Sequence, residues 1–305
     1  MNNLDNYRTY GVEVEFISPL SQRELVEEIN RNSRNHNSQS LADLQFDMPI
    51  VCISSYSNDD SSIWRIKTDG SVSGRGHGLE LVTPVLKGEM DMLRLRKILT
   101  WLEEIGCTVN RTCGLHVHVG VSDWQVSQFK NLAKRYMKFE TAIDTFMPRS
   151  RRSSQNSYCQ SNAKYLANEI RYRSQFDTCD LAGMFTKINK ARTAKDVSTA
   201  IQPRGHSGRY VKLNLHSFWK HGTVEFRHHS GTICGDKIDN WVRVCLAMTH
   251  LADSKRSIKA KSGDQIDTYQ DKLSVFFNGL SKGCDLITTD IRRFYNKRRK
   301  ALCTN

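Results

Sequence analysis

Four short stretches of the sequence place charged or metal-binding residues at every second position, an alternation typical of β-strands. They are GVEVEF (11–16), GLHVHV (114–119), YVKLNLH (210–216) and TVEFRHH (223–229). Successive side chains of a strand point to opposite faces of the sheet, so the charged residues of each stretch share one face and apolar residues fill the other. A polar face normally carries lysine, threonine and serine. A face made of carboxylates, histidines and arginine predicts an active-site sheet.

Composition places the chain among ordinary globular proteins. It has 305 residues, of which 38 % are hydrophobic and 25 % are charged. No apolar run approaches the roughly 20 residues needed to span a membrane, and the first residues lack the apolar core of a signal peptide. The nine cysteines contain no C-x-x-C pair. We therefore expect reduced thiols in a cytoplasmic protein.

The net charge of +13 is the one unusual feature of the composition. Positive residues cluster at 149–152, 171–173 and 292–300. Such a surplus can attract nucleic acid or another polyanion by releasing counterions. It can equally reflect a solvated surface together with the phosphate-binding residues of a nucleotide site. Nucleic acid is one partner that the charge allows, and the charge alone names no function.

The order of the predicted elements favours an α+β protein with a mainly antiparallel sheet, covered by helices on its apolar face. Strands are predicted over residues 10–17, 49–54, 63–68, 77–83, 114–119, 210–216 and 223–229. Longer helices are predicted over residues 90–105, 124–146, 236–252, 265–279 and 285–301, and residues 31–48 are predicted to form a loop. We expect one catalytic domain over residues 1–305, with a basic insertion at about 122–208 and a basic helical segment at about 255–305.

Five residues of the alternating pattern have side chains suited to hard divalent cations. They are Glu13, Glu15, Glu80, His116 and Glu225. Oxygen ligands with an occasional imidazole suit Mg²⁺ or Mn²⁺ better than Zn²⁺. Several carboxylates on one buried face would be costly without a cation between them. The sequence therefore predicts a divalent-cation site, with two ions as the expected number.

A second group of residues could bind phosphate. The guanidinium of Arg227 is planar and can grip two phosphate oxygens at once. The basic, glycine-containing loop at residues 73–78 carries Arg75, and the strand at 210–216 places Lys212 and Asn214 on one face. Together with cations, such groups could clamp the β- and γ-phosphates of a nucleotide. Each group alone also fits a surface ion pair or an exposed strand, so the prediction rests on their coincidence.

The order of these motifs resembles the glutamine synthetase and glutamate–cysteine ligase superfamily, and more closely its putative amidoligase family. The resemblance is carried by GVEVEF, DGSV…GLELVTPVL, CGLHVHVG, YVKLNLH and TVEFRHHSGT, which together span residues 11–232. It implies an ATP-dependent carboxylate–amine ligase on a curved antiparallel sheet of the glutamine synthetase type, whose polar concave face holds Mg²⁺ and ATP. Substrate identity does not carry over, because the basic middle segment matches nothing that defines a substrate pocket.

Matched motif by motif, the resemblance also implies roles for the candidate ligands. Glu15 and Glu80 would hold one cation. The nucleotide-bridging cation would be held by Glu13, His116 and Glu225.

The resemblance further implies that His118 lies near ATP and that Arg227 binds its phosphates. We expect the γ-phosphoryl group to pass to a substrate carboxylate, and an amine then to displace phosphate from the acyl phosphate. His229 and Asp69 are the candidate bases. A further group of arginines lies in or beside predicted loops that could close over an anionic substrate. That group is Arg151, Arg204 and Arg209.

Three rival interpretations remain open from the sequence. A metal-dependent phosphoesterase or nuclease would use similar residues without ATP. A phosphotransferase acting on a guanidino group would release ADP and no phosphate. A nucleic-acid-binding protein would depend on the basic surface and tolerate loss of the carboxylates.

Overall fold

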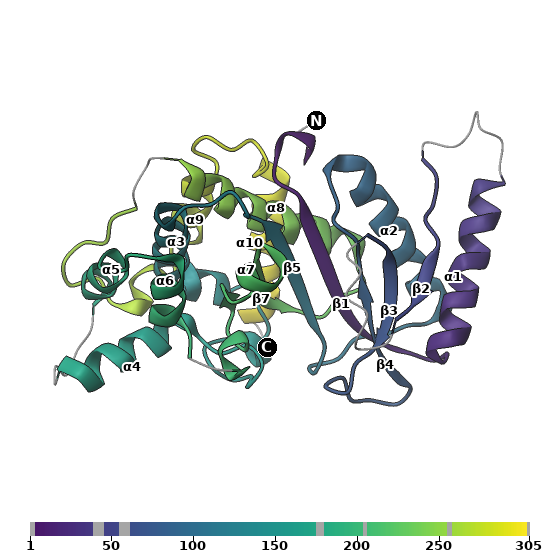
Figure 1. Cartoon of the computed structure of the whole chain (residues 1–305), viewed down its shortest axis with the longest axis horizontal. Helices are drawn as coiled ribbons and strands as arrows, with labels where there is room; N and C mark the ends of the chain where they lie inside the picture. The colour runs from purple at the N-terminus through teal and green to yellow at the C-terminus, as the bar shows by residue number, and fades with distance from the viewer. Residues whose placement is uncertain are drawn as a thin grey trace. The chain divides into compact units, whose positions relative to one another are not determined.

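The fold is of the mixed α+β kind that the sequence predicts (Figure 1). The computed structural model describes residues 4–38, 46–54, 62–174, 180–203, 206–254 and 258–303. In these ranges there are seven β-strands and ten α-helices. The strands are hydrogen-bonded in the order β2-β3-β4-β1-β5-β7-β6. Pairing is antiparallel between β1 and β4, β3 and β4, and β6 and β7, and parallel between β2 and β3. The glutamine synthetase-like form of the sheet stays a prediction.

The strands, α-helices and 3₁₀-helices have the following bounds. The strands are β1 (Tyr10–Ser18), β2 (Val51–Ile53), β3 (Trp64–Thr68), β4 (His77–Val82), β5 (Gly114–Gly120), β6 (Leu213–Asn214) and β7 (Thr223–Ser230). The α-helices are α1 (Gln22–Asn37), α2 (Gly88–Ile105), α3 (Val126–Asp144), α4 (Asn162–Ser174), α5 (Leu181–Asn189), α6 (Ala194–Ile201), α7 (Ser217–His221), α8 (Gly235–Asp253), α9 (Leu273–Leu280) and α10 (Thr289–Cys303). Four 3₁₀-helices complete the described elements: η1 (Leu4–Asn6), η2 (Arg149–Arg151), η3 (His206–Arg209) and η4 (Ile266–Tyr269).

The structure differs from the predicted elements in several places. The helix predicted at 265–279 is the 3₁₀-helix η4 followed by α9. The predicted loop at 31–48 is helical as far as Asn37, the end of α1. The strand predicted at 210–216 is reduced to the two residues of β6, since Lys212 lies in a bend. The turn predicted around His221 and Gly222 is the short helix α7, which Gly222 ends in the left-handed conformation at φ 65°. Such a φ suits glycine, which lacks a Cβ.

The chain divides into two compact units, and each is described by itself. The first unit is Met1–His118 with His229–Val242, and the second is Val119–His228 with Arg243–Asn305. By sequence, the first contains 13 lysines and arginines against 18 aspartates and glutamates, a net charge of −5. The second contains 32 against 14, a net charge of +18. The positive excess therefore belongs entirely to the second unit, which also contains both segments predicted as basic additions.

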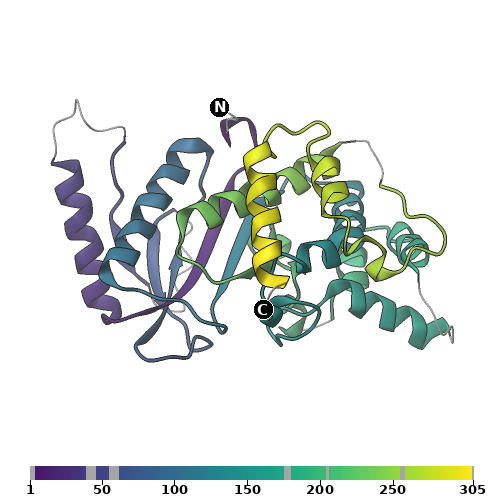
Figure 2. The ribbon, with the colours of Figure 1, turned by 180° about the vertical axis from the view of Figure 1, so that it is seen from behind.

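In the first unit, strand alternation separates an apolar face from a polar one. Val14 lies opposite Leu81, which in turn lies opposite Ile66, and all three side chains are buried. Helices α1 and α2 lie together on one side of these strands (Figure 2). They bring their own buried leucines, isoleucines and methionine, so the hydrophobic effect joins helices to sheet on this side. The carboxylates of β1 and β4 are left for the other face.

Amide side chains of α1 fasten the helix to the edge of the sheet. The Asn30 side chain donates to the Val51 carbonyl at 2.9 Å and accepts from the Val51 N–H at 2.8 Å. Seven residues later, Asn37 makes the same pair of bonds with Met48. These bonds satisfy backbone groups that an edge strand would otherwise expose. They also explain why a polar asparagine-rich segment continues as helix.

The second unit is built around α3. This helix contacts α4, α5, α6, α9 and η4 (Figure 1). Its buried aromatic residues are Phe129, Tyr136 and Phe139. Strand β6 pairs with β7, with Leu213 opposite Phe226 and Asn214 opposite Glu225. Across the described part of the whole chain, every helix is too short or too polar to cross a membrane.

The amide contacts of α1 predict a measurable contribution to stability. Replacing Asn30 by alanine removes two hydrogen bonds and leaves the Val51 backbone groups without that partner. We expect the free energy of unfolding to fall by about 1–3 kcal/mol, since each such bond contributes roughly 0.5–1.5 kcal/mol. Urea denaturation would measure the change. Asn35→Ala, an exposed substitution on the same helix, should change it by less than about 0.5 kcal/mol. Equal effects of the two substitutions would contradict this role.

Candidate functional site

The polar face of the first unit brings three predicted ligands together. Glu15 of β1 lies directly opposite Glu80 of β4. Ligand atoms of Glu15, Glu80 and His116 lie within 4.8 Å of one another. Side chains directly opposite in an antiparallel pair share a face, and β5 adds His116 beside them. The alternation in three separate stretches of sequence thus converges on one place.

Glu15 is held firmly within this group. One carboxylate oxygen, Oε2, accepts a hydrogen bond from the Gly114 N–H at 2.6 Å. The other, Oε1, lies 3.5 Å from Nε2 of His116. Both residues are buried. One oxygen fixes the carboxylate to the start of β5, and the second faces the cluster.

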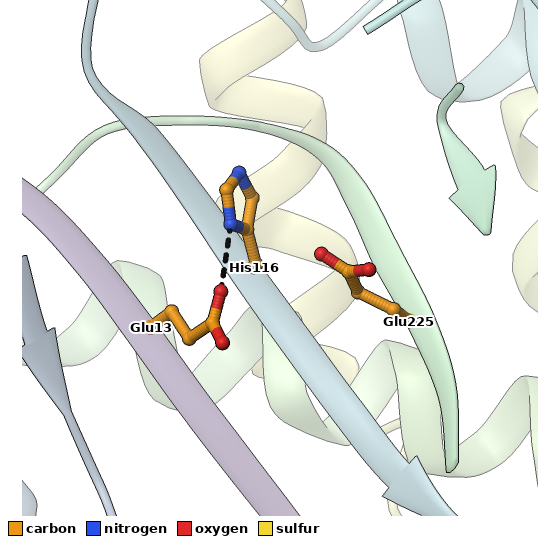
Figure 3. A group of neighbouring side chains, drawn as sticks. All are labelled: Glu13, His116 and Glu225. Atoms are coloured by element: carbon orange, nitrogen blue, oxygen red, sulfur yellow. Dashed lines mark hydrogen bonds and ion pairs between the residues drawn. The ribbon is translucent and has the colours of Figure 1, made fainter. Parts of the chain in front are cut away.

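His116 also contacts Glu13 (Figure 3). Its Nδ1 lies 3.1 Å from Oε2 of Glu13, while Nε2 of His118 lies 3.4 Å from Oε1 of the same carboxylate. Burial works to raise the pKa of Glu13, but the charges and hydrogen bonds of His118 and His116 outweigh it. The pKa of Glu13 is therefore held well below its usual range, and this carboxylate is ionised.

Glu80 is in the opposite situation. Burial raises the pKa of Glu80 well above its usual range, and the negative charges of Glu13, Glu15 and Asp69 raise it further. The charge of Lys67, which lies opposite Glu80 on β3, lowers the pKa of Glu80, but by less than burial and the three acidic residues raise it. A carboxyl placed among carboxylates keeps its proton unless another positive charge replaces it.

The chemistry and contacts of these residues fit a divalent cation. The donor set is two carboxylates and one imidazole, which suits Mg²⁺ or Mn²⁺. His116 has one ring nitrogen directed to each of two glutamates, so it can offer one to a cation while the other is oriented by a carboxylate. A cation would also relieve the repulsion that raises the pKa of Glu80.

Two basic residues on the same face were not among the residues predicted from the sequence. Arg65 and Lys67 lie on β3, and the register places Lys67 in line with Glu80 and Glu15. The signal was present in the sequence, because WRIKT alternates apolar and basic residues as the other motifs alternate apolar and acidic ones. Arg65 is 4 % exposed, which is unusual for an arginine.

Three other predicted residues of the first unit are not part of the ligand group. Asp69 begins the β3–β4 loop, where its Oδ1 accepts hydrogen bonds from the N–H and hydroxyl of Ser71 at 2.7 and 2.6 Å. Arg75 is exposed in the same loop. His229 is fully buried beside Trp241, and its Nδ1 lies 2.7 Å from the Ser230 carbonyl oxygen. Of the two candidate bases, only Asp69 is close enough to influence Glu80.

In the second unit, Glu225 is positioned by two neighbours. Its Oε2 accepts a hydrogen bond from the side-chain amide of Asn214 at 2.6 Å, and its Oε1 forms an ion pair with Nη1 of Arg227. Buried Gln202 in turn donates to Oδ1 of Asn214 at 3.2 Å. The structure therefore brings Glu225, Arg227 and Asn214 together through these contacts. The role of Glu225 as a cation ligand stays a prediction.

Lys212 does not share the face of Asn214 as predicted. It is fully buried, with Nζ 2.5 Å from Oδ1 of Asp144 and 3.3 Å from Oε1 of Glu140. The bend at Lys212 interrupts the alternation on which the prediction rested. The same Asp144 oxygen lies 2.5 Å from Nε2 of His228. Lys212 thus belongs to a buried ion-pair cluster rather than to a nucleotide site.

The arginines predicted in mobile loops also differ. Arg151 is buried within η2, where a solvated loop was expected. Arg209 is exposed and lies over the ring of Tyr210, 4.9 Å from its centroid. Arg204 lies outside the described residues. Of the two that the structure describes, Arg209 has the exposure that contact with a substrate would need and Arg151 does not.

The raised pKa of Glu80 can be tested by varying the pH and by adding Mg²⁺. An unfolded glutamate titrates near ~4.3, and the cation-free folded state holds this proton more tightly. The stabilising contribution of the protonated carboxyl is complete below that pH and is lost as the pH rises through the raised pKa. At pH 8 without cations, we expect Glu80→Gln to melt at a higher temperature than wild type. Wild type should gain more from added Mg²⁺.

Melting temperatures at pH 5 and pH 8, with and without Mg²⁺, would check both expectations. Glu104→Gln removes an exposed carboxylate of the same unit and serves as the control. If wild type and Glu80→Gln show the same pH dependence and the same response to Mg²⁺, the assignment of Glu80 to the cation group is wrong.

Comparison with models of protein families gives a match over most of the chain. A family model described as "Putative amidoligase enzyme" matches residues 6–249. The matched region begins before β1 and ends within α8, so it includes the carboxylate–histidine group as well as Glu225 and Arg227. No curated protein matches the chain. The family model covers well over half of the 305 residues, and the chain therefore belongs to the putative amidoligase family.

Proposed function

We propose that this protein is an ATP-dependent carboxylate–amine ligase that forms an amide or isopeptide bond. In this proposal, the γ-phosphoryl group of ATP passes to a substrate carboxylate and gives an acyl phosphate and ADP. A neutral amine then attacks the acyl carbon and releases phosphate. Membership of the putative amidoligase family supports ligase chemistry. The observation that carries the proposal further is the convergence of Glu15, Glu80 and His116 on one buried place.

The proposal gives the carboxylate–histidine group the role of a cation site. Glu15, Glu80 and His116 would hold one Mg²⁺ or Mn²⁺ ion, and Glu13 and Glu225 are each proposed as a further cation ligand within its own unit. Cations bound in such sites neutralise phosphate charge and orient the transferring group, which contributes several kcal/mol. The chain's own part is to fix the ligands before the substrates arrive. The hydrogen bond from Gly114 to Glu15 and the two histidine contacts of Glu13 serve that purpose.

Arg227 is the proposed phosphate-binding residue. Its ion pair with Glu225 holds the guanidinium within the second unit, and Asn214 holds Glu225 from the other side. A guanidinium that is already oriented loses less side-chain entropy when it binds phosphate. His118 is proposed to lie near the nucleotide, where its contact with Glu13 fixes the ring. Asp69 is the better placed of the two candidate bases, because His229 is fully buried against Trp241.

The release of ADP tests this function directly. Purified protein would be incubated with Mg²⁺-ATP and pooled candidate acids and amines, and ADP and phosphate would be measured. We expect Glu15→Gln and Glu225→Gln each to lower the turnover rate at least about 100-fold, because each removes charge stabilisation from the transition state. Glu104→Gln should leave the rate unchanged, and circular dichroism would show that all variants are folded.

The products distinguish this chemistry from its rivals. Formation of AMP and pyrophosphate would contradict an acyl phosphate, and ADP without phosphate would indicate transfer to a stable acceptor such as a guanidino group. Hydrolysis of nucleic acid without ATP would favour a nuclease. If Glu15→Gln and Glu225→Gln both turn over at the normal rate, the assignment of these two residues as cation ligands is wrong.

The charge distribution leads to a separate proposal about partners. The second unit carries a net charge of +18 and the first carries −5, so we propose that a nucleic acid or other polyanion contacts the second unit. The logarithm of the binding constant for an oligonucleotide should then fall linearly with the logarithm of the salt concentration. Lys297→Glu with Lys300→Glu, both exposed on α10, should weaken binding, whereas Arg23→Glu in the first unit should not. Fluorescence anisotropy would measure each constant, and binding that is insensitive to salt would contradict the proposal.

A further inference from the structure

Two tyrosines of the second unit pack against each other at the surface, beside an arginine. Tyr158 is 48 % exposed. Its ring centroid lies 5.1 Å from that of Tyr210, and the two ring planes are at 89° to each other. In such an edge-to-face pair, one ring offers an edge and the other offers one face. Tyr158 therefore keeps at least one ring face that Tyr210 does not cover.

Arg209 completes this stacking group, which we define as Tyr158, Tyr210 and Arg209. The Arg209 side chain is exposed, and its Cζ lies 4.9 Å from the centroid of the Tyr210 ring. Its Nη2 donates a hydrogen bond to the Tyr210 hydroxyl oxygen at 2.8 Å. Both contacts are to a tyrosine rather than to a carboxylate, so neither of them neutralises the guanidinium. The stacking group thus presents aromatic surface and positive charge side by side.

Hydrogen bonds hold the backbone of the stacking group in place. The Gln160 N–H donates to the Tyr210 carbonyl at 2.9 Å, and the Lys212 N–H donates to the Gln160 carbonyl at 3.0 Å. The Tyr158 N–H donates to the side-chain oxygen of Asn156 at 2.8 Å. A tyrosine has only two side-chain torsions, so on a fixed backbone it loses little entropy when it binds a ligand.

Two of the basic stretches seen in the sequence meet on the segment that leads to Tyr158. Nη2 of Arg152 donates to the Leu302 carbonyl at 3.2 Å, and Nε of Arg298 donates to the Phe146 carbonyl at 2.7 Å. These contacts join the stretch at 149–152 to the basic helix α10. Tyr158 follows six residues after Arg152, so the two Cα atoms are at most roughly 22 Å apart. A short oligonucleotide can span that distance.

We propose that the stacking group binds a base of a single-stranded nucleic acid. This goes beyond the ligase chemistry and rests on the proposal that a polyanion contacts the second unit, whose net charge is +18. Every base has a face that can stack on an aromatic ring, and an arginine beside the ring adds a cation–π contribution. A duplex offers only base edges, because its base faces are already stacked. The phosphates of the strand would follow the basic stretch at 149–152 and α10.

Fluorescence anisotropy on the full chain tests this site. The probes are a single-stranded DNA of about 12 nucleotides, an RNA of the same sequence and the DNA duplex, all measured without ATP or Mg²⁺. Tyr158→Ala should bind the single strands about fivefold or more weakly than wild type, because a base loses its stacking partner. Its affinity for the duplex should be unchanged. Loss for DNA, for RNA or for both supports the site and identifies the strand that it binds.

Control variants separate stacking from other effects of the substitution. Tyr158→Phe keeps the ring and should bind as wild type does, whereas Tyr158→Leu keeps an apolar side chain without a ring and should bind as weakly as Tyr158→Ala. Val275→Ala shortens another exposed apolar side chain of the second unit and should leave every affinity unchanged. If Tyr158→Ala fails to fold by circular dichroism, Tyr158→Leu and Arg209→Gln decide the question, and both should weaken single-strand binding.

The salt dependence separates stacking from charge. Tyr158→Ala removes no positive charge, so the slope of the logarithm of the binding constant against the logarithm of the salt concentration should equal that of wild type. Lys297→Glu with Lys300→Glu removes charge from α10 and should make the slope shallower. A slope that changes equally in both variants would contradict a stacking role for Tyr158.

The remaining outcomes overturn the inference. They are unchanged single-strand affinity in Tyr158→Ala, equal losses for single strand and duplex, and no oligonucleotide binding by wild type. The first of these leaves the polyanion proposal standing if the α10 variant still weakens binding. A non-hydrolysable ATP analogue is measured in parallel, and its failure to bind wild type would count against the ligase function alone. Loss of the analogue from Tyr158→Ala with oligonucleotide binding retained would make Tyr158 part of a nucleotide site instead.

Discussion

Repulsion among carboxylates on one face is the constraint on which the rest of the first unit depends. The pKa values of Glu13 and Glu80 are shifted in opposite directions on this face. Two histidines stabilise the ionised form of Glu13, whereas Glu80 keeps its proton because burial and its neighbours penalise a further negative charge. The sheet therefore has one carboxylate that is ready for a cation and one that must lose a proton to accept it. If a cation binds at this site, this coupling makes its binding depend on pH.

In the second unit, a buried cluster of hydrogen bonds holds β7 in place. His228 follows Arg227 in sequence and lies on the opposite side of the strand, where Tyr136 and Asp144 engage its two ring nitrogens at 2.7 and 2.5 Å. Burial lowers the pKa of His228 to about 4, so the ring is neutral and accepts one hydrogen bond while donating the other. Lys212 forms an ion pair with the same Asp144 oxygen. A fully bonded cluster of this kind fixes the strand that presents Arg227 and Glu225.

The sequence indicated which residues of one strand share a face, but it did not indicate which residues of other strands lie beside them. The reason is physical. Alternation is a local property of a strand, so it placed Glu13 and Glu15 on one face, as the structure confirms. Which strands lie side by side, and in which register, depends on pairings between distant residues, and no local pattern indicates that Lys67 lies opposite Glu80. The misplacement of Lys212 has the same origin, because a bend held by distant acids interrupts a local rule.

Net charge and local charge have different roles in this protein. The surplus of +18 in the second unit attracts anions over distances of about 8–10 Å at physiological salt, beyond which counterions screen it. An anion that reaches the polar face of the first unit meets the negative charge of Glu13 at short range. Attraction by the whole molecule cannot offset repulsion at contact distance, since interactions between close, partly buried charges are screened far less. Positive charges close to this face can do so, and Arg65 and Lys67 on β3 are two residues that carry them there.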